Sequence, residues 1–378
     1  MRILVCPDKF KGSLPAHLVA RAMSDGIRDA DPRYQVDAAP MADGGDGTVD
    51  AFLAAMGGKK QTVPVLDPLG REVESFLGLL PGGSVVLEMA AASGLAMVPE
   101  EARNPLYTSS YGTGQLMVQA MEYGCRSVII GIGGSATNDG GMGLLSALGA
   151  RFYDGAGRPL TSCTGAEMLQ VRRVDLSGLP DLSGISIQVA CDVTNPLCGP
   201  DGASAVFGPQ KGADSQMVAE LDQGLARFGV LLSQATGRDT QSTPGSGAAG
   251  GVGGALYGLG ADLVPGTRLV IEAAGLRERM AACDWVLTGE GATDASTLFG
   301  KVPDAMGALA KELHKPALCL CGSLLSGYKP LYHRGILGAF SILNRPMEAA
   351  YAMAHPYELI RDGAENLCRV MSLGFKKT

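Results

Sequence analysis

The chain has 378 residues, of which 46 % are hydrophobic and 18 % are charged, so it can bury a sizeable core and is neither intrinsically disordered nor collagen-like. Its formal net charge is −7 and no block of like charge occurs, which argues against a nucleic-acid partner. No apolar run has the length of a signal peptide or of a membrane span, so we expect a cytoplasmic protein without a membrane partner. The nine cysteines are scattered without a CxxC pair and indicate reduced thiols in the core.

Short β-rich runs alternate with helical patterns along the chain. Strands are expected at 2–6, 35–39, 127–132, 185–191, 285–288, 316–321 and 336–342. Most of these runs are continuously apolar, as is typical of strands buried on both faces of a parallel sheet. Apolar residues at helical spacing predict a helix after Pro15, a second over 217–232 and a last one from about Pro356 to Gly374.

Other segments do not fit this alternation. Residues 61–89, 150–154 and 269–273 have the pattern of antiparallel strands with turns. We therefore predict an α/β protein with a Rossmann-like, doubly wound parallel sheet domain and a second, mixed α/β domain. The first is expected over 1–58, 104–145, 184–238 and 280–378, and the second over 59–103, 146–183 and 239–279. The buried runs that begin at 2, 127, 185, 285 and 316 are predicted to be parallel neighbours in one sheet.

A glycine-rich loop between a buried strand and a helix gives the strongest local signal. It carries small residues with amide or hydroxyl donors: Gly133, Gly134, Ser135, Thr137 and Asn138. Such a loop brings backbone N–H groups close to an anion, and a helix N-terminus adds partial positive charge, which predicts a phosphate- or substrate-binding site. The alternative is a plain turn in which Asn138 or Asp139 caps the helix.

The same loop loosely matches a dinucleotide fingerprint. Gly131, Gly133 and Ala136 have its spacing, and Asp154 follows at nearly the distance expected for a ribose ligand. This match supports an NAD-dependent dehydrogenase of a small hydroxy acid as a second hypothesis. A non-catalytic sugar-acid binding protein is a third. Neither a Walker loop nor a protein-kinase signature is present.

Carboxylates recur just after the proposed parallel strands. They are Asp8, Asp43, Asp192, Glu290 and Asp294. Ligands of open α/β sheets bind beyond these strand ends, so we expect the acids to meet in one crevice suited to Mg²⁺ and a general base. Each acid alone also fits a cap or turn position.

Three lysines follow similar loops: Lys11, Lys211 and Lys301. An ammonium group can hold a substrate carboxylate or a phosphoryl group, although a solvated surface lysine is the simpler interpretation of each. The stretch 245–256 (GSGAAGGVGGAL) fits either another anion loop or a helix packed closely through small residues.

The segments together resemble the bacterial class I glycerate kinase family. In chain order they are PDKFKGSLPA, PMADGGDGT, YTSSYGTGQL, GIGGSATNDGG, CDVTNPLCGPDGASAVFGPQKGA, GSGAAGGVGGAL and TGEGATD with Gly300 and Lys301. The resemblance covers nearly the whole chain and implies ATP-dependent phosphorylation of D-glycerate at O2 to give 2-phosphoglycerate. Family members usually have an arginine where this chain has Ala292.

A kinase mechanism assigns roles to the singled-out residues. Asp192 is the expected base, with Asp294 and Lys11 as further catalytic residues, and Lys11 is expected to meet the substrate carboxylate. The metal ligands are expected to be Asp8, Asp43 and Glu290. Substrate or phosphate is expected to bind the glycine loop, Asn195, Lys211 and Lys301. ATP, Mg²⁺ and glycerate are the expected ligands, and the sequence leaves open which loop binds ATP and which binds glycerate. It also leaves open whether the protein is a monomer or a homodimer.

Overall fold

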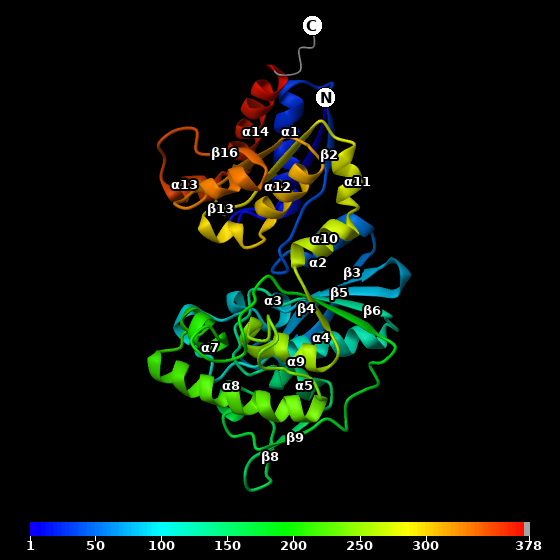
Figure 1. The fold of residues 1–378 in the computed structure, drawn as a ribbon, viewed down its shortest axis with the longest axis vertical. Coiled ribbons are helices and arrows are strands. Elements are labelled where there is room, and N and C mark those ends of the chain that lie inside the picture. The colour runs from blue at the N-terminus through cyan, green and yellow to red at the C-terminus, as the bar shows by residue number, and fades with distance from the viewer. Residues whose placement is uncertain (374–378) are drawn as a thin grey trace. The chain divides into compact units, whose positions relative to one another are not determined.

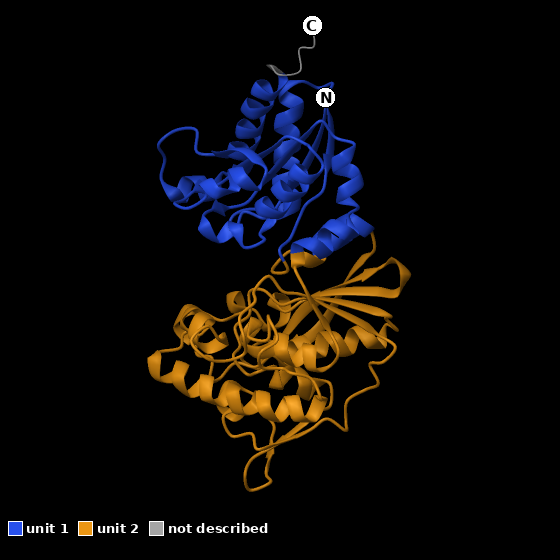
Figure 2. Cartoon of the chain, viewed as in Figure 1, with its two compact units in different colours: residues 1–43, 50–56, 267–378 blue, residues 44–49, 57–266 orange. Residues whose placement is uncertain are grey.

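The computed structural model describes residues 1–373, which form two compact units with separate hydrophobic cores (Figure 2). Unit 1 comprises residues 1–43, 50–56 and the described chain from 267 onward, and unit 2 comprises 44–49 and 57–266. The predicted domain boundaries differ from this division, because 104–145 and 184–238 belong to unit 2.

Unit 1 is built on a parallel sheet in the order β16-β14-β12-β1-β2. Its strands are β1 (Arg2–Pro7), β2 (Gln35–Ala38), β12 (Trp285–Gly289), β14 (Ala317–Cys321) and β16 (Ile336–Ser341). Numbered along the unit, this is the doubly wound order 2-1-3-4-5, in which the direction of winding reverses between β1 and β12. The predicted fold class is therefore confirmed.

Helices and short strands complete unit 1. They are α1 (Ala16–Ala30), α2 (Thr48–Met56), α10 (Gly266–Ala273), α11 (Leu276–Ala281), β13 (Ala292–Thr293), α12 (Val302–Glu312), β15 (Ser323–Leu324), α13 (Ala349–Ala354) and α14 (Pro356–Leu373). The first residues of α2 and α10 are assigned to unit 2. The strand predicted at 269–273 is wrong, because this segment is helical: Thr267 and Val270 are buried at helical spacing on one face of α10.

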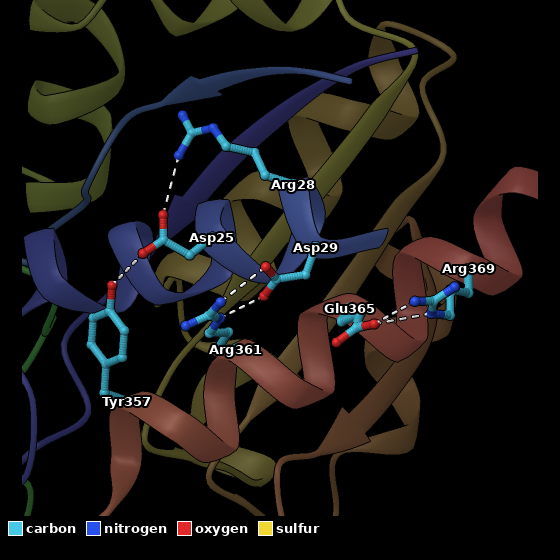
Figure 3. A network of polar contacts seen from close by, with 7 residues as sticks. All are labelled: Asp25, Arg28, Asp29, Tyr357, Arg361, Glu365 and Arg369. Carbon is cyan, nitrogen blue, oxygen red and sulfur yellow. Dashed lines mark hydrogen bonds and ion pairs between the residues drawn. The ribbon is translucent and has the colours of Figure 1, made fainter. Parts of the chain in front are cut away.

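The predicted first and last helices are confirmed as α1 and α14, which lie side by side (Figures 1 and 3). Gly26 of α1 lets the backbones approach, since a Cβ there would lie 2.1 Å from the carbonyl oxygen of Arg361. At the edges of this contact, Tyr357 donates a hydrogen bond to Asp25, and Arg361 pairs with Asp29 (Figure 3). Gly374 lies outside the described residues.

An ion-pair cluster ties β1 and β2 to α11. The Asp37 carboxylate accepts hydrogen bonds from Nη2 of Arg279 at 2.5 Å and from Nη2 of Arg2 at 3.3 Å. The bonded Arg279 guanidinium lowers the pKa of Asp37, so this carboxylate stabilises the fold above its ordinary pKa, and the contribution is lost as the pH falls through the lowered value. We expect Asp37→Asn to lower Tm at pH 7 and the difference from wild type to shrink below about pH 4. Thermal unfolding over this pH range, with Asp262→Asn as a control at an exposed site, measures the effect; a difference that is independent of pH would contradict it.

Unit 2 has its own sheet, in the order β11-β10-β6-β5-β4-β3. The strands are β3 (Lys59–Leu66), β4 (Glu72–Leu80), β5 (Ser84–Glu88), β6 (Ser127–Gly131), β10 (Ser186–Ala190) and β11 (Asp262–Val264). From β11 to β5 the neighbours are parallel, whereas β4 and β3 extend the sheet antiparallel. A small antiparallel sheet holds β7 (Arg151–Tyr153), β8 (Pro159–Leu160) and β9 (Arg173–Asp175). The antiparallel predictions for 61–89 and 150–154 are confirmed.

The helices of unit 2 are mostly short. They are α3 (Ala90–Ser93), α4 (Tyr111–Glu122), α5 (Met142–Ala147), α6 (Gly165–Met168), α7 (Ala203–Phe207), α8 (Ser215–Thr236) and α9 (Val252–Gly258). The long helix α8 is capped by Asp214, whose side chain accepts a hydrogen bond from the amide of Met217, and it packs against α7 and α9 (Figure 1).

The prediction of a single parallel sheet is wrong. Strands β6 and β10 are parallel neighbours as expected, but they belong to the sheet of unit 2, whereas β1, β12 and β14 form that of unit 1. A continuously apolar run indicates burial on both faces but does not specify the partner strand, so the two sheets look alike in the sequence. All nine cysteines are unpaired and eight are buried. Over residues 1–373 no helix combines the length and apolar character that crossing a membrane requires.

Candidate active site

The carboxyl edge of the unit 1 sheet carries two buried acids where the winding reverses. Asp8 follows β1, Glu290 follows β12, and the amide of Asp8 donates to the carbonyl of Gly289 at 2.8 Å. Each acid is only 6 % exposed. Open α/β sheets bind their ligands at such a reversal, so Asp8 and Glu290 occupy the position where a ligand of this unit is expected.

Electrostatics at this edge favour a cation. Burial, followed by the neighbouring Asp43 carboxylate, raises the pKa of Asp8 to about 7, against the opposing effect of Lys9. The Lys9 ammonium lies 3.6 Å from Oδ1 of Asp43. Burial also raises the pKa of Glu290, whose Oε1 accepts a hydrogen bond from Thr297 Oγ1 at 2.6 Å. A cation that binds here would relieve the repulsion between carboxylates.

These acids could supply some of the ligands of Mg²⁺, with the remaining ligands coming from substrate and water. Among the residues that the structure describes, no group of three or more His, Cys, Asp or Glu side chains is arranged to hold a metal ion. Mg²⁺ usually takes one or two protein carboxylates together with substrate phosphates and water. Asp8, whose pKa the Asp43 carboxylate raises, fits that pattern together with Asp43, whereas one oxygen of Glu290 is already bonded to Thr297.

Asp294 and Lys301 lie in a hydrogen-bond network of unit 1 that reaches Glu290 through Thr297. Asp294 Oδ1 accepts from the amide and hydroxyl of Ser296, and Thr297 Oγ1 accepts from the amide of Asp294, which makes a capping box. The hydrogen bonds from Ser296 lower the pKa of Asp294. The Lys301 ammonium donates to Ser296 Oγ at 2.7 Å. Asp294 therefore caps the following turn, and its role in catalysis stays a prediction.

Lys11 and Ala292 are exposed residues close to the loop after β12. The backbone of Lys11 passes over Gly291, where a Cβ would lie 3.0 Å from the Lys11 nitrogen. Its ammonium is available to a ligand, since the Lys11 side chain is exposed. Ala292 stands where the resembled family usually has an arginine. It lies in the short strand β13 and pairs with Ser323 of β15.

In unit 2, two of the predicted motifs come together. The loop after β6 packs on Gly44 and Gly45: the amide of Gly133 donates to the carbonyl of Gly44 at 3.1 Å, and a Cβ at Gly133 would lie 2.8 Å from the Cα of Gly45. A Cβ at Gly134 would lie 3.6 Å from Oδ1 of Asp46. Only glycine permits this approach of two backbones.

The loop 132–141 turns its carbonyl groups toward the protein. The carbonyl oxygens of Gly134, Ala136 and Thr137 accept from the amide of Leu95, the hydroxyl of Thr108 and the ammonium of Lys211. The amides of Gly134, Ser135 and Thr137 have no acceptor within residues 1–373. Successive N–H groups without an acceptor are what an anion-binding loop requires.

One part of the predicted anion site is wrong. The start of α5 is occupied by Asp139, whose fully buried carboxylate accepts from the amides of Gly141 and Gly143 and from the amide and hydroxyl of Ser110. Burial raises the pKa of Asp139, which these hydrogen bonds oppose. Asp139 therefore caps this helix, as in the alternative interpretation, and the helix end does not supply donors to a ligand.

Polar atoms without partners mark the same loop. Oγ1 of Thr137 and Oδ1 of Asn138 are buried and have no hydrogen-bond partner in the described chain, although Nδ2 of Asn138 donates to Ser204 Oγ at 2.8 Å. Such atoms cost free energy unless a ligand or water satisfies them. The predicted residues Thr137 and Asn138 thus have capacity left for a polar ligand.

Asp192 and Asn195 follow β10 in the same unit. Oδ1 of the half-buried Asp192 accepts from the amide of Gly266 at 2.8 Å. Nδ2 of Asn195 donates to the carbonyl of Asp201, within its own loop. Asp192 follows a strand of the unit 2 sheet and Asp8 one of the unit 1 sheet, so the predicted acids do not share one sheet edge, and their meeting in one crevice stays a prediction.

Lys211 does not lie at the surface. Its side chain is 2 % exposed, and Nζ donates to Ser135 Oγ at 3.0 Å and to the Thr137 carbonyl at 2.6 Å. The stretch 245–256 is close-packed, since a Cβ at Gly250 would lie 2.0 Å from the Thr137 carbonyl oxygen. This supports the close-packing interpretation of that stretch.

The structure gives no support to the dinucleotide fingerprint. Asp154 follows β7, which belongs to the small antiparallel sheet and not to the sheet that contains β6. Its carboxylate accepts from the amides of Ala156 and Arg158 in its own turn. A ribose ligand would instead follow the parallel strand beside the glycine loop.

Some site residues were missed in the sequence. Asp46 lies beside Gly134, and Glu88 at the end of β5 accepts from the amide of Val49 at 2.6 Å. Asp46 belongs to the same glycine-rich segment as Asp43, so the sequence alone could have identified it as a candidate. Glu88 ends an apolar strand, a position that could have been recognised only with the strand order in hand.

Comparisons with known proteins agree over the full length. The model of the glycerate kinase family matches residues 3–372. The chain is 42 % identical to a glycerate 2-kinase of Escherichia coli, over 100 % of this chain and 99 % of the relative, and 42 % identical to a glycerate kinase of Halalkalibacterium halodurans, over 98 % of each. A crystal structure of a glycerate kinase 2 candidate from Salmonella typhimurium superposes with a TM-score of 0.87 at 42 % identity, covering 100 % of both chains. On this full-length agreement, the chain belongs to the glycerate kinase family.

Proposed function

We propose that the protein transfers the γ-phosphoryl group of ATP to the 2-hydroxyl of D-glycerate and releases 2-phosphoglycerate and ADP. The observation that carries this proposal is the full-length similarity to relatives named glycerate kinase and glycerate 2-kinase. Membership of this family favours a kinase over a dehydrogenase or a non-catalytic binding protein.

Unit 1 supplies the residues for a magnesium nucleotide. Mg²⁺, when bound, neutralises charge on the nucleotide phosphates. Asp8 and Asp43 are the residues that would hold it, since the Asp43 carboxylate lies close enough to the buried Asp8 to raise the pKa of Asp8. Glu290 positions Thr297 and, through it, the loop that ends at Lys301.

Unit 2 supplies an anion-binding loop and a base. The amides of Gly134, Ser135 and Thr137 are the donors for a carboxylate or phosphate oxygen, and Thr137 and Asn138 add side-chain atoms. Asp192 is the proposed base: Gly266 holds one of its carboxylate oxygens. A carboxylate fixed in this way can accept the proton of the attacking hydroxyl.

The test is product analysis with the purified protein. With Mg-ATP and D-glycerate we expect ADP and a phosphate ester whose ³¹P signal is split by one carbon-bound proton, as attachment at O2 requires. Attachment at O3 would give splitting by two protons and would refute the position. Absence of ADP formation, or glycerate-dependent reduction of NAD⁺ to NADH, would refute the kinase activity itself.

A charge-removing variant tests the proposed role of Lys11. Lys11→Met keeps most of the apolar stem but loses the ammonium, so we expect KM for glycerate to rise roughly 10- to 100-fold, the worth of a charge-assisted hydrogen bond, while KM for ATP changes little. Lys329→Met, at another exposed lysine of unit 1, is the matched control. A rise confined to KM for ATP would assign Lys11 to the nucleotide.

We further propose a cytoplasmic enzyme whose partners are small molecules. The net charge of −7, without a basic cluster, is the basis for excluding nucleic acid. Monomer and homodimer both remain compatible with this proposal.

A further inference from the structure

We propose that Lys211 is a positioning residue that holds the anion-binding loop 132–141 from inside unit 2, through Ser135 and Thr137, and that it does not touch the substrate. The proposal rests on the proposed function of that loop. It revises the expectation that Lys211 binds phosphate directly.

The contacts of the ammonium group carry the argument. Nζ donates to Ser135 Oγ at 3.0 Å and to the Thr137 carbonyl at 2.6 Å, so a single side chain bonds the loop at two points two residues apart. Both acceptors belong to residues whose own amides lack acceptors within residues 1–373. Fixing the Thr137 carbonyl and the Ser135 side chain fixes the orientation of the peptide groups between them.

The surroundings of Lys211 exclude a role at the surface. The side chain is 2 % exposed, in the segment Pro209–Lys211 that follows α7. The following Gly212 packs on the backbone of Arg103, where a Cβ would lie 2.1 Å from the Arg103 carbonyl oxygen. Lysine is almost never fully buried unless it is paired, because removing an ammonium group from water costs free energy. We therefore infer that this buried lysine has a function.

The charge of the group adds a second effect. Burial lowers the pKa of Lys211 to about 7, and the Asp139 carboxylate, which caps α5, opposes that shift. The protonated form of Lys211 is thus favoured by the Asp139 carboxylate in the loop 132–141. An ammonium behind the loop favours an anion in front of it without contacting it.

Hydrogen exchange of the ligand-free protein tests the positioning directly. In Lys211→Met we expect the amides of Ala136 and Gly140, which are bonded to Ser93 and Gly250, to exchange faster, while the β6 amides of 128–131 keep their wild-type rates. Because no substrate is present, this result is independent of the proposed kinase activity. Unchanged exchange at Ala136 and Gly140 would overturn the proposal, and so would faster exchange throughout unit 2, which indicates a role in overall stability only.

Kinetics separate positioning from direct contact. We expect Lys211→Met to lose roughly 10²-fold in kcat/KM, the scale of a misplaced binding group, and Lys59→Met, an exposed lysine of the same unit, to lose nothing. Since Lys211 acts through Ser135, the double variant Lys211→Met/Ser135→Ala should lose no more than Lys211→Met alone. Losses that multiply would place the ammonium on the substrate and overturn the proposal. Should Lys211→Met fail to fold, Ser135→Ala alone must still accelerate exchange at Ala136.

Discussion

Asp192→Asn is expected to fold, to bind Mg-ATP and to lose roughly 10²- to 10⁴-fold in kcat, the usual worth of a positioned general base. Asparagine has the size of aspartate and keeps an oxygen that can accept the hydrogen bond from the amide of Gly266. The substitution therefore removes basicity while the attachment to the start of α10 is preserved. Steady-state kinetics at saturating Mg-ATP and glycerate measure the loss.

Asp262→Asn is the matched control for this variant. Asp262 begins β11, the strand that pairs with β10, and its side chain is exposed. We expect wild-type kinetics from the control. If Asp192→Asn instead loses magnesium affinity and keeps its turnover at saturating metal, Asp192 is a ligand, and a base must be sought among the other acids.

The sequence predicts the strands of this protein well because most are continuously apolar. The seven expected runs match seven observed strands to within one or two residues, for example 185–191 against β10 (Ser186–Ala190). Their distribution between two sheets could not be predicted, since the pairing of β6 with β10, and of β1 with β12, depends on contacts between segments far apart in the chain. Local patterns do not encode such pairings.

The candidate site was predicted unevenly for a similar reason. Asp8 and Glu290 follow strands, and this position alone places them at the edge of the unit 1 sheet. Lys211 was predicted to bind substrate or phosphate, with a solvated surface lysine as the alternative, and only the fold reveals its buried contacts with Ser135 and Thr137. The loop after β6 combines the two interpretations of its sequence, a helix cap and an anion-binding site. Asp139 caps α5, whereas the amides of Gly134, Ser135 and Thr137 have no acceptor in the described chain.

Gly134→Val is expected to weaken anion binding more than it weakens folding. Gly134 has φ +73°, a conformation that costs an L-residue about 1–2 kcal/mol, and a β-branched side chain there would stand between Ala90 and Asp46 at the loop surface. Loss of one charge-assisted hydrogen bond from the loop would raise the dissociation constant roughly 10- to 100-fold. Isothermal titration with Mg-ATP and with glycerate, performed separately, also identifies which of the two ligands the loop binds.

Gly157→Val separates binding from backbone strain. Gly157 has φ +76° in the turn between β7 and β8, and no atom lies within 4 Å of a Cβ placed there. Both variants therefore bear a similar conformational cost, which thermal unfolding should report as a similar decrease in Tm. Only Gly134→Val should lose affinity, because only Gly134 lies among amides without acceptors in the described chain. Equal affinities in the two folded variants for both ligands would show that the loop after β6 binds neither, and the anion site would then have to be sought at the lysines of unit 1.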